Sequence, residues 1–144
     1  MFAVAIGTLV LGAGVVLWAF ASKTSVSRRL DALARWFDAI AFAKEHPSAA
    51  DFDTRIAANR RDFQARFDRA RLLIAQQQWT GAMDELLEIL MRDKSWNEEQ
   101  ARKTYIAVLE IIEPPKPKVA EGQIPPDDPM VATYRRRLSS VVLS

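Results

Sequence analysis

The residue types that carry most enzyme chemistry are scarce in this 144-residue sequence. It contains no cysteine and one histidine, His46. Disulfides, thiolate metal sites and thiol–disulfide exchange are therefore excluded, and neither a histidine-built zinc site nor a Ser-His-Asp triad is expected. His46 directly precedes Pro47, and a residue before proline avoids the helical region. We expect His46 in a loop at the end of a helix, without a role as a ligand.

Paired carboxylates are the remaining candidates for acid–base chemistry. The pairs are Asp51 and Asp53, Glu98 and Glu99, Glu110 and Glu113, and Asp127 and Asp128. Acid–base catalysis needs one carboxyl group in a buried setting that raises its pKa, whereas these pairs fit solvated helix surfaces or helix caps. Gly81 and Gly122 are isolated, so no phosphate-binding loop is present. We predict no catalytic residue, no cofactor, no bound metal and no enzyme activity.

Arginines form two clusters. The first comprises Arg60, Arg61, Arg66, Arg69 and Arg71, and the second comprises Arg135, Arg136 and Arg137. Carboxylates are interspersed and the formal net charge is +2, so we interpret both clusters mainly as solvated, ion-paired faces. Docking to an acidic protein surface or to anionic headgroups is the alternative. No aromatic platform accompanies the arginines, which argues against nucleic-acid binding.

The elements that would position these residues divide at Ser22. All 20 Lys and Arg and all 18 Asp and Glu residues follow Ser22, and the only hydroxyl within residues 1–21 is Thr8. About 20 apolar residues in a helix span the hydrocarbon core of a bilayer, so residues 1–22 are predicted to be a single-pass transmembrane anchor. The predicted membrane-interface residues are Trp18, Phe20, Lys23, Arg28 and Arg29.

Basic residues follow the apolar run and none precedes it. The positive-inside rule then places the body on the cytoplasmic side or, in an organelle, in the matrix at the mitochondrial inner membrane. A cleaved signal peptide is one alternative, since Ala19-Phe20-Ala21 has the small-x-small form, although a basic n-region is missing. A buried core helix is another, although a body of this size hardly covers a helix that is apolar on all sides.

The body predicts helices only. Residues 23–47 form an amphipathic connecting helix that Ser25 or Ser27 can cap, with one apolar face of Leu30, Leu33, Phe37, Ile40 and Ala41. Trp36 and Phe42 lie off this face, where they pack within the domain or touch lipid or another subunit.

Residues 48–144 form the helical domain. A short helix follows Ser48 and closes at Asn59, and helices over about 62–77 and 80–92 form an antiparallel hairpin. A helix capped by Asn97 runs to about residue 112, a proline-rich loop follows at 113–128, and Asp127 or Asp128 caps the last helix with Pro129 at its first position.

The hairpin from Ala65 to Lys94 resembles a tetratricopeptide (TPR) unit. Small residues, Ala70 and Ala82, stand where the two helices of such a unit cross closely, and Trp79 takes the large turn position.

Four short motifs extend the resemblance to one family. In order they are Arg92-Asp93-Lys94-Ser95-Trp96, Gln100-Ala101-Arg102-Lys103-Thr104, Asp128-Pro129, and Tyr134-Arg135-Arg136-Arg137-Leu138. Residues 51–144 thereby resemble the C-terminal TPR-like region of bacterial chaperedoxins, the YbbN/CnoX-type thioredoxin–TPR co-chaperones, without the thioredoxin domain. Members of that family hold unfolding clients and pass them to the chaperonin through this region. The resemblance implies partner binding by Tyr134, Arg135, Arg136, Arg137 and Leu138.

We therefore expect an all-α, TPR-like domain behind one transmembrane helix, acting as a non-catalytic protein–protein interaction module. A co-chaperone or assembly-factor adaptor without redox activity is the main hypothesis, with a chaperonin among its protein partners. The alternative is a permanent accessory subunit of a membrane complex, such as a mitochondrial respiratory assembly. A truncated gene whose leader is incidental is a third possibility.

Overall fold

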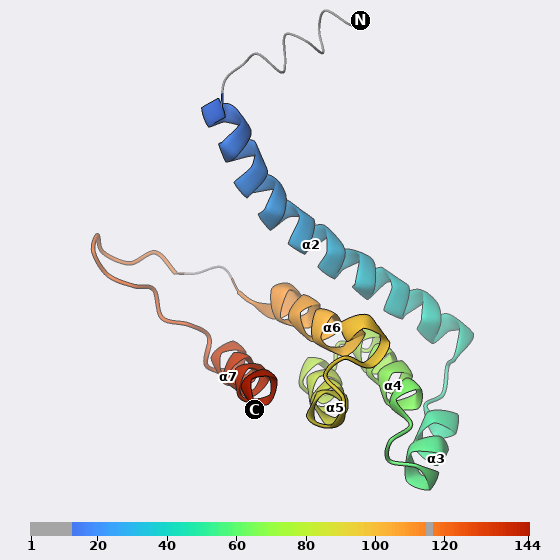
Figure 1. The fold of residues 1–144 in the computed structure, drawn as a ribbon. Helices are drawn as coiled ribbons and strands as arrows, with labels where there is room; N and C mark the ends of the chain where they lie inside the picture. The colour runs from blue at the N-terminus through green and yellow to red at the C-terminus, as the bar shows by residue number, and fades with distance from the viewer. Residues whose placement is uncertain (1–12, 115–116) are drawn as a thin grey trace, which may run out of the picture.

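The computed structural model describes residues 13–114 and 117–144, with side chains from Val26 onward. These residues form six helices and no strand (Figure 1). The helices are α2 (Ala13–Glu45), α3 (Ala50–Ala58), α4 (Phe63–Ala75), α5 (Trp79–Arg92), α6 (Trp96–Ile112) and α7 (Pro129–Leu143). The all-α prediction is thereby confirmed for the described part of the chain.

The helices pack in three layers. Helices α4 and α6 form the middle layer, the long helix α2 packs across both of them, and α5 and α7 pack on their other side (Figure 1). Helices α4 and α5 form the predicted antiparallel hairpin, and α3 packs against α4. The backbone of α2 does not closely approach α5 or α7, although the Trp36 side chain of α2 reaches Trp79 at the start of α5.

Local capping explains where several helices begin and end. The Asp62 carboxylate accepts the backbone N–H of Ala65 at 3.1 Å, and the Asp128 carboxylate accepts that of Val131 at 3.1 Å. Such caps satisfy N–H groups that the first helical turn leaves unpaired. Asp128 with Pro129 at the start of α7, and Asn59 at the end of α3, are confirmed.

Three predicted caps differ in the structure. Helix α2 runs without a break from Ala13, so neither Ser25 nor Ser27 begins a helix. Helix α3 has Ala49 at its N-cap, with the Ser48 hydroxyl accepting the N–H of Ala50 at 3.2 Å. Helix α6, Trp96–Ile112, contains a kink at Asn97, Glu98 and Glu99, whose backbone angles are not helical, so its regular part follows Glu99 and Asn97 does not cap it. Just before this kink the Asp93 carboxylate accepts both the N–H and the hydroxyl of Ser95. Asn97 and the two residues after it have positive φ angles.

The core lies between the three layers. Its largest fully buried side chains are Tyr105, Met83, Leu86, Ile89, Leu90, Val108 and Val131. Ala70 and Ala82 are completely buried, in agreement with the small residues expected where α4 and α5 cross. Beyond α6, residues 117–128 form an extended loop with one turn, where Gly122 has a φ of 83°.

Helix α2 packs through a different face from its apolar stripe. Ala32 and Ala39 are buried against the middle layer, and the Trp36 ring meets Trp79 edge-on with centroids 5.3 Å apart. Trp36 therefore packs within the domain. Leu30 and Phe37, from the predicted apolar face, are 60% and 65% exposed. Alanines allow the close helix approach that larger side chains on the buried face would prevent.

The predicted membrane anchor lies mostly outside the described residues. No helix within 13–114 or 117–144 combines the length and the apolar character needed to cross a membrane. Residues 1–12, and the side chains of Trp18, Phe20 and Lys23, lie outside the part whose structure is described. The anchor at residues 1–22 therefore stays a prediction.

Candidate partner-binding groove

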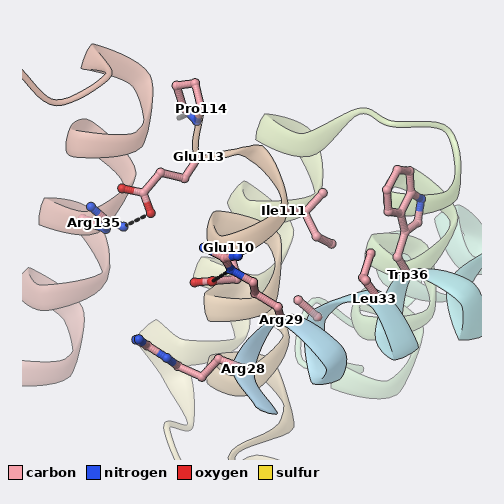
Figure 2. A pocket seen from close by; sticks show the side chains of 10 residues that line it. Arg28, Arg29, Leu33, Trp36, Glu110, Ile111, Glu113, Pro114 and Arg135 are labelled. Carbon is pink, nitrogen blue, oxygen red and sulfur yellow. Dashed lines mark hydrogen bonds and ion pairs between the residues drawn. The ribbon is translucent and has the colours of Figure 1, made fainter. Parts of the chain in front are cut away.

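Helices α2, α6 and α7 surround an open groove with a volume of about 790 Å³ (Figure 2). It is lined by Arg28, Arg29, Ala32, Leu33, Trp36, Glu110, Ile111, Glu113, Pro114 and Arg135. We call it the α2–α6–α7 groove. Three segments far apart in the sequence therefore build one surface.

The apolar part of this groove comes from α2 and from the end of α6. Leu33 and Trp36 contribute from α2, and Ile111 and Pro114 from the other wall (Figure 2). Helix α6 ends at Ile112 because Pro114 and the prolines after it cannot continue a helix. The Trp36 Nε1 atom is buried and has no hydrogen-bond partner among the described residues.

Charged side chains border the groove. Arg29 Nε lies 3.8 Å from Glu110, and Arg135 donates to Glu113 at 2.6 Å (Figure 2). Arg28 has no hydrogen bond or ion pair with any described residue. Exposed ion pairs contribute at most about 1 kcal/mol, so these arginines can exchange partners readily. The groove therefore offers apolar contact together with cationic hydrogen-bond donors.

The structure brings together residues from two separate predictions. Arg28 and Arg29 were assigned to the membrane interface and Arg135 to partner binding, and all three line this groove. The rest of the Tyr134–Leu138 run lies elsewhere. Arg136 is exposed and its guanidinium reaches Thr133, while Leu138 packs against the core.

Tyr134 is a core residue with structural hydrogen bonds. Its hydroxyl donates to Asp84 at 3.0 Å, and its carbonyl accepts the Tyr105 hydroxyl at 2.6 Å. Arg137 lies over the Tyr134 ring at 4.8 Å and pairs with Asp84 at 3.4 Å. Burial raises the pKa of both tyrosines, which keeps them protonated as donors. Partner binding by the whole run stays a prediction, with Arg135 as its member in the groove.

A buried ion-pair network between α4 and α5 was not predicted from the sequence. Glu85 of α5 accepts from Arg66 at 2.5 Å and from Arg69 at 2.6 Å, and Arg69 also pairs with Asp53 at 2.9 Å. The side chains of Arg66 and Glu85 are 10% and 8% exposed. The solvated-face interpretation is therefore wrong for Arg66. A signal was available, because Glu85 shares the buried helical face of Ala82, Leu86 and Ile89.

The contacts of the other candidate groups, such as His46, Arg71 and Asp62, are with neighbouring side chains and backbone groups. His46 is exposed, stacks on Phe42 with centroids 4.3 Å apart, and lies 3.2 Å from its carbonyl oxygen. Arg71 lies over the same Phe42 ring at 3.9 Å. The hydrogen bond from the Ala65 N–H holds the pKa of Asp62 below its ordinary value. Within the described ranges no group of three or more His, Cys, Asp or Glu residues is arranged to hold a metal ion.

The sequence comparison decides the family. A family model described as tetratricopeptide repeat matches residues 42–124. The chain belongs to the tetratricopeptide repeat family. No curated protein and no solved structure matches the chain in the corresponding comparisons. Repeats of this family generally mediate protein–protein interaction through the surfaces that stacked helix pairs create.

In this tetratricopeptide repeat protein one such surface is already covered. Stacked helical repeats expose a concave face that binds partners. Here α4 and α6, the first helices of successive pairs, are both packed against α2, while the second helices α5 and α7 lie on the far side (Figure 1). The α2–α6–α7 groove lies at the edge of this covered face.

Proposed function

We propose that this chain is a non-catalytic adaptor, anchored in a membrane by residues 1–22, whose α2–α6–α7 groove binds a segment of a partner protein. The observation that carries the proposal is the composition of the groove, in which apolar side chains are bordered by three arginines, two of them paired with Glu110 and Glu113. The covered face of α4 and α6 supports the choice of this groove over the inner surface of the repeats.

The groove favours a partner segment that combines a bulky apolar side chain with a carboxylate. The apolar side chain would pack against Trp36, Ile111 and Pro114, where burial supplies most of the affinity. The carboxylate would pair with Arg28, which has no carboxylate partner within the described residues. Complementary charge at the rim sets specificity and association rate more than affinity.

The resemblance to chaperedoxins supports a co-chaperone or assembly-factor role for the adaptor. In that role the partner is a chaperonin or an unfolding client, and the body lies on the cytoplasmic side of the membrane. The sequence has no cysteine, so this role includes no thiol redox step. The order of the four motifs and the tetratricopeptide repeat match over residues 42–124 both support it.

Affinity purification in mild detergent tests the groove. Arg28→Glu should lower partner recovery, because it places a carboxylate where the partner's carboxylate binds. Arg61→Glu is the matched control, since Arg61 is exposed, its side chain has no partner among the described residues and it does not line the groove. Equal partner recovery from both variants would contradict the groove. Recovery of neither a chaperonin nor unfolded clients would contradict the co-chaperone role.

The second candidate is a permanent accessory subunit of a membrane complex, such as a respiratory assembly of the mitochondrial inner membrane. The exposed apolar side chains on α2 favour it, since Leu30 and Phe37 are the kind of residues that a fixed neighbour covers. A subunit would co-purify in stoichiometric amount with one large complex, whereas an adaptor would bind reversibly.

Carbonate extraction tests the anchor. A chain whose residues 1–22 span the bilayer stays in the membrane pellet at alkaline pH. Release of the full chain into the supernatant would contradict the anchor. It would not bear on partner binding by the groove, which the Arg28→Glu variant tests.

A further inference from the structure

One face of α2 exposes a line of large apolar side chains. Val26, Leu30, Leu33 and Phe37 are 51%, 60%, 42% and 65% exposed. We call these four residues the α2 stripe. An exposed line of apolar residues along a well-formed helix usually marks a surface that a partner covers.

Val26, Leu30 and Phe37 of the α2 stripe face away from the chain's own body, and Leu33 lies where the stripe borders the α2–α6–α7 groove. The opposite side of the helix carries the buried Ala32 and Ala39. Between them Arg35 donates to Gln100 at 2.9 Å and to Thr104 at 3.2 Å, both on α6. These contacts hold α2 in one orientation, so the body cannot cover the stripe without breaking them.

The spacing of the α2 stripe is that of a helix–helix seam. Its members follow one another after four, three and four residues, and Ile40, half-buried, continues the pattern after three more. This alternation places apolar residues every 3.5 residues on average, which is the pattern of parallel two-helix packing. Ala34 and Ala41 are exposed beside it, and their small size lets a second helix approach closely.

The length of α2 determines what can reach the stripe. The helix is continuous from Ala13 to Glu45, and each residue adds about 1.5 Å. If residues 1–22 span the bilayer, as the proposed function holds, Leu30 lies about 14 Å and Phe37 about 24 Å beyond Ala21 along the helix. Leu30 and Phe37 then lie outside the hydrocarbon layer, where a second protein chain can cover them.

We propose that the stripe of a second copy of this chain covers the α2 stripe, with the two α2 helices parallel and in register. Identical anchors enter one membrane in the same direction, so two copies meet with their helices parallel. No charged residue lies on this face between Val26 and Ala41. Pairing of two copies through this face therefore does not place like charges opposite each other. The parallel direction depends on the proposed anchor, whereas the pairing itself depends only on the stripe.

The contact between the two α2 stripes is short, and we expect it to form because both chains are held in the same membrane. It extends over about two heptads, which is less than isolated coiled coils need. Two copies held in one bilayer have a high effective concentration, and a weak contact then becomes highly populated. The pairing is therefore expected for the full chain in a membrane.

Cysteine cross-linking tests the pairing directly, because the natural chain has no cysteine. Single variants Leu30→Cys and Phe37→Cys are prepared in the full chain and oxidised in phosphatidylcholine vesicles. A disulfide needs Cα atoms within about 7 Å, which the parallel seam provides at both positions. Asp38→Cys is the matched control, because Asp38 is exposed next to Phe37 but lies off the stripe and has no side-chain partner. We expect about tenfold more disulfide dimer from each stripe variant than from the control, since proximity in the seam raises the effective concentration.

Three results would overturn the proposal. Equal dimer yields at Phe37→Cys and Asp38→Cys would mean random collision. If an additional variant, Leu33→Cys, forms dimers while Leu30→Cys and Phe37→Cys do not, the helices are antiparallel, because only residues near the centre of an antiparallel pair meet their counterparts. Absence of dimers from all stripe variants, with unchanged helical circular dichroism, would mean that another protein or lipid covers the stripe.

Carbonate extraction of the same vesicles separates this proposal from the anchor. A chain that stays in the pellet without cross-linking contradicts the pairing and leaves the anchor supported. A chain that is released, yet cross-links at Leu30→Cys and Phe37→Cys, contradicts the anchor and supports the pairing. As a second measurement, the double variant Phe37→Glu with Leu30→Cys should form much less disulfide dimer than Leu30→Cys alone.

Discussion

Replacing Glu85 by alanine is the substitution whose effect the structure defines most sharply. The Glu85 carboxylate is 8% exposed and accepts one guanidinium on each of its oxygens, from Arg66 at 2.5 Å and from Arg69 at 2.6 Å. It joins the two helices of the hairpin, since both arginines lie in α4 and Glu85 lies in α5. The substitution removes both ion pairs at once.

The two arginines are affected unequally. Arg69 is 39% exposed and keeps its pair with Asp53 at 2.9 Å. Loss of the Arg69–Glu85 pair therefore lowers stability by at most about 1 kcal/mol. Arg66 is 10% exposed and keeps only the hydrogen bond from Nε to the Arg60 carbonyl at 2.8 Å. Leaving one charge of a buried pair without its partner lowers stability by about 3–5 kcal/mol. We therefore expect Glu85→Ala to lower the free energy of unfolding by about 3–5 kcal/mol.

Urea unfolding of the full chain in mild detergent, followed by far-ultraviolet circular dichroism, measures this loss. Asp53→Ala is the control, because it removes only the exposed pair of Arg69 and should lower stability by at most about 1 kcal/mol. A double substitution, Arg66→Met with Glu85→Leu, should recover most of the loss, since apolar residues of similar volume replace buried pairs well. A loss for Glu85→Ala as small as that for Asp53→Ala would refute the reasoning.

Three further predictions concern the caps and the core. Asp62→Ala should lower stability by about 1 kcal/mol at pH 7. The Ala65 N–H keeps the folded pKa of Asp62 below its ordinary 3.8, so the contribution of the carboxylate is present above pH 3.8 and is lost as the pH falls through the lower folded pKa. The unfolding free energies of wild type and Asp62→Asn should therefore converge as the pH falls below that folded pKa, and a constant difference would contradict the cap. Tyr105→Phe removes the hydroxyl that holds the Tyr134 carbonyl at 2.6 Å and should lower stability by about 1 kcal/mol, with faster hydrogen exchange in α7 than in α4; equal exchange in both helices would show that this bond does not hold α7. Ala82→Leu places a large side chain at a fully buried helix crossing and should lower the thermal midpoint by an amount equivalent to about 1–3 kcal/mol. By contrast, Ala57→Leu, at an exposed position of α3, should change stability by no more than about 0.5 kcal/mol.

Local signals determined most of the helix pattern. The caps at Asp62 and Asp128, the small residues Ala70 and Ala82, and the prolines after α6 each act on residues a few positions away. Such effects are legible in the sequence because capping, crossing distance and proline restriction depend on neighbouring residues alone. The repeat match over residues 42–124 agrees with the hairpin that these signals predict.

The orientation of α2 was decided by tertiary structure. Its sequence offers an apolar face through Leu30 and Phe37, but the helix packs through Ala32 and Ala39 instead. Close packing against two helices favours small residues at the contact, and the Arg35 hydrogen bonds to Gln100 and Thr104 add directional contacts from α6. Hydrophobic periodicity identifies a helix face, yet it does not say whether the face meets the chain's own body or a neighbour.

The charged sites show the same division. The sequence by itself determined that this protein has no thiol chemistry, a charge-free run before Ser22 and a tetratricopeptide-type hairpin with arginines around it. Only the tertiary structure decided that Arg66 is buried on Glu85 and that Arg28 and Arg135 line one groove. The physical reason is distance along the chain: the residues of each pair lie 19 or more positions apart. Their interaction exists only after the helices pack, and no local pattern encodes it.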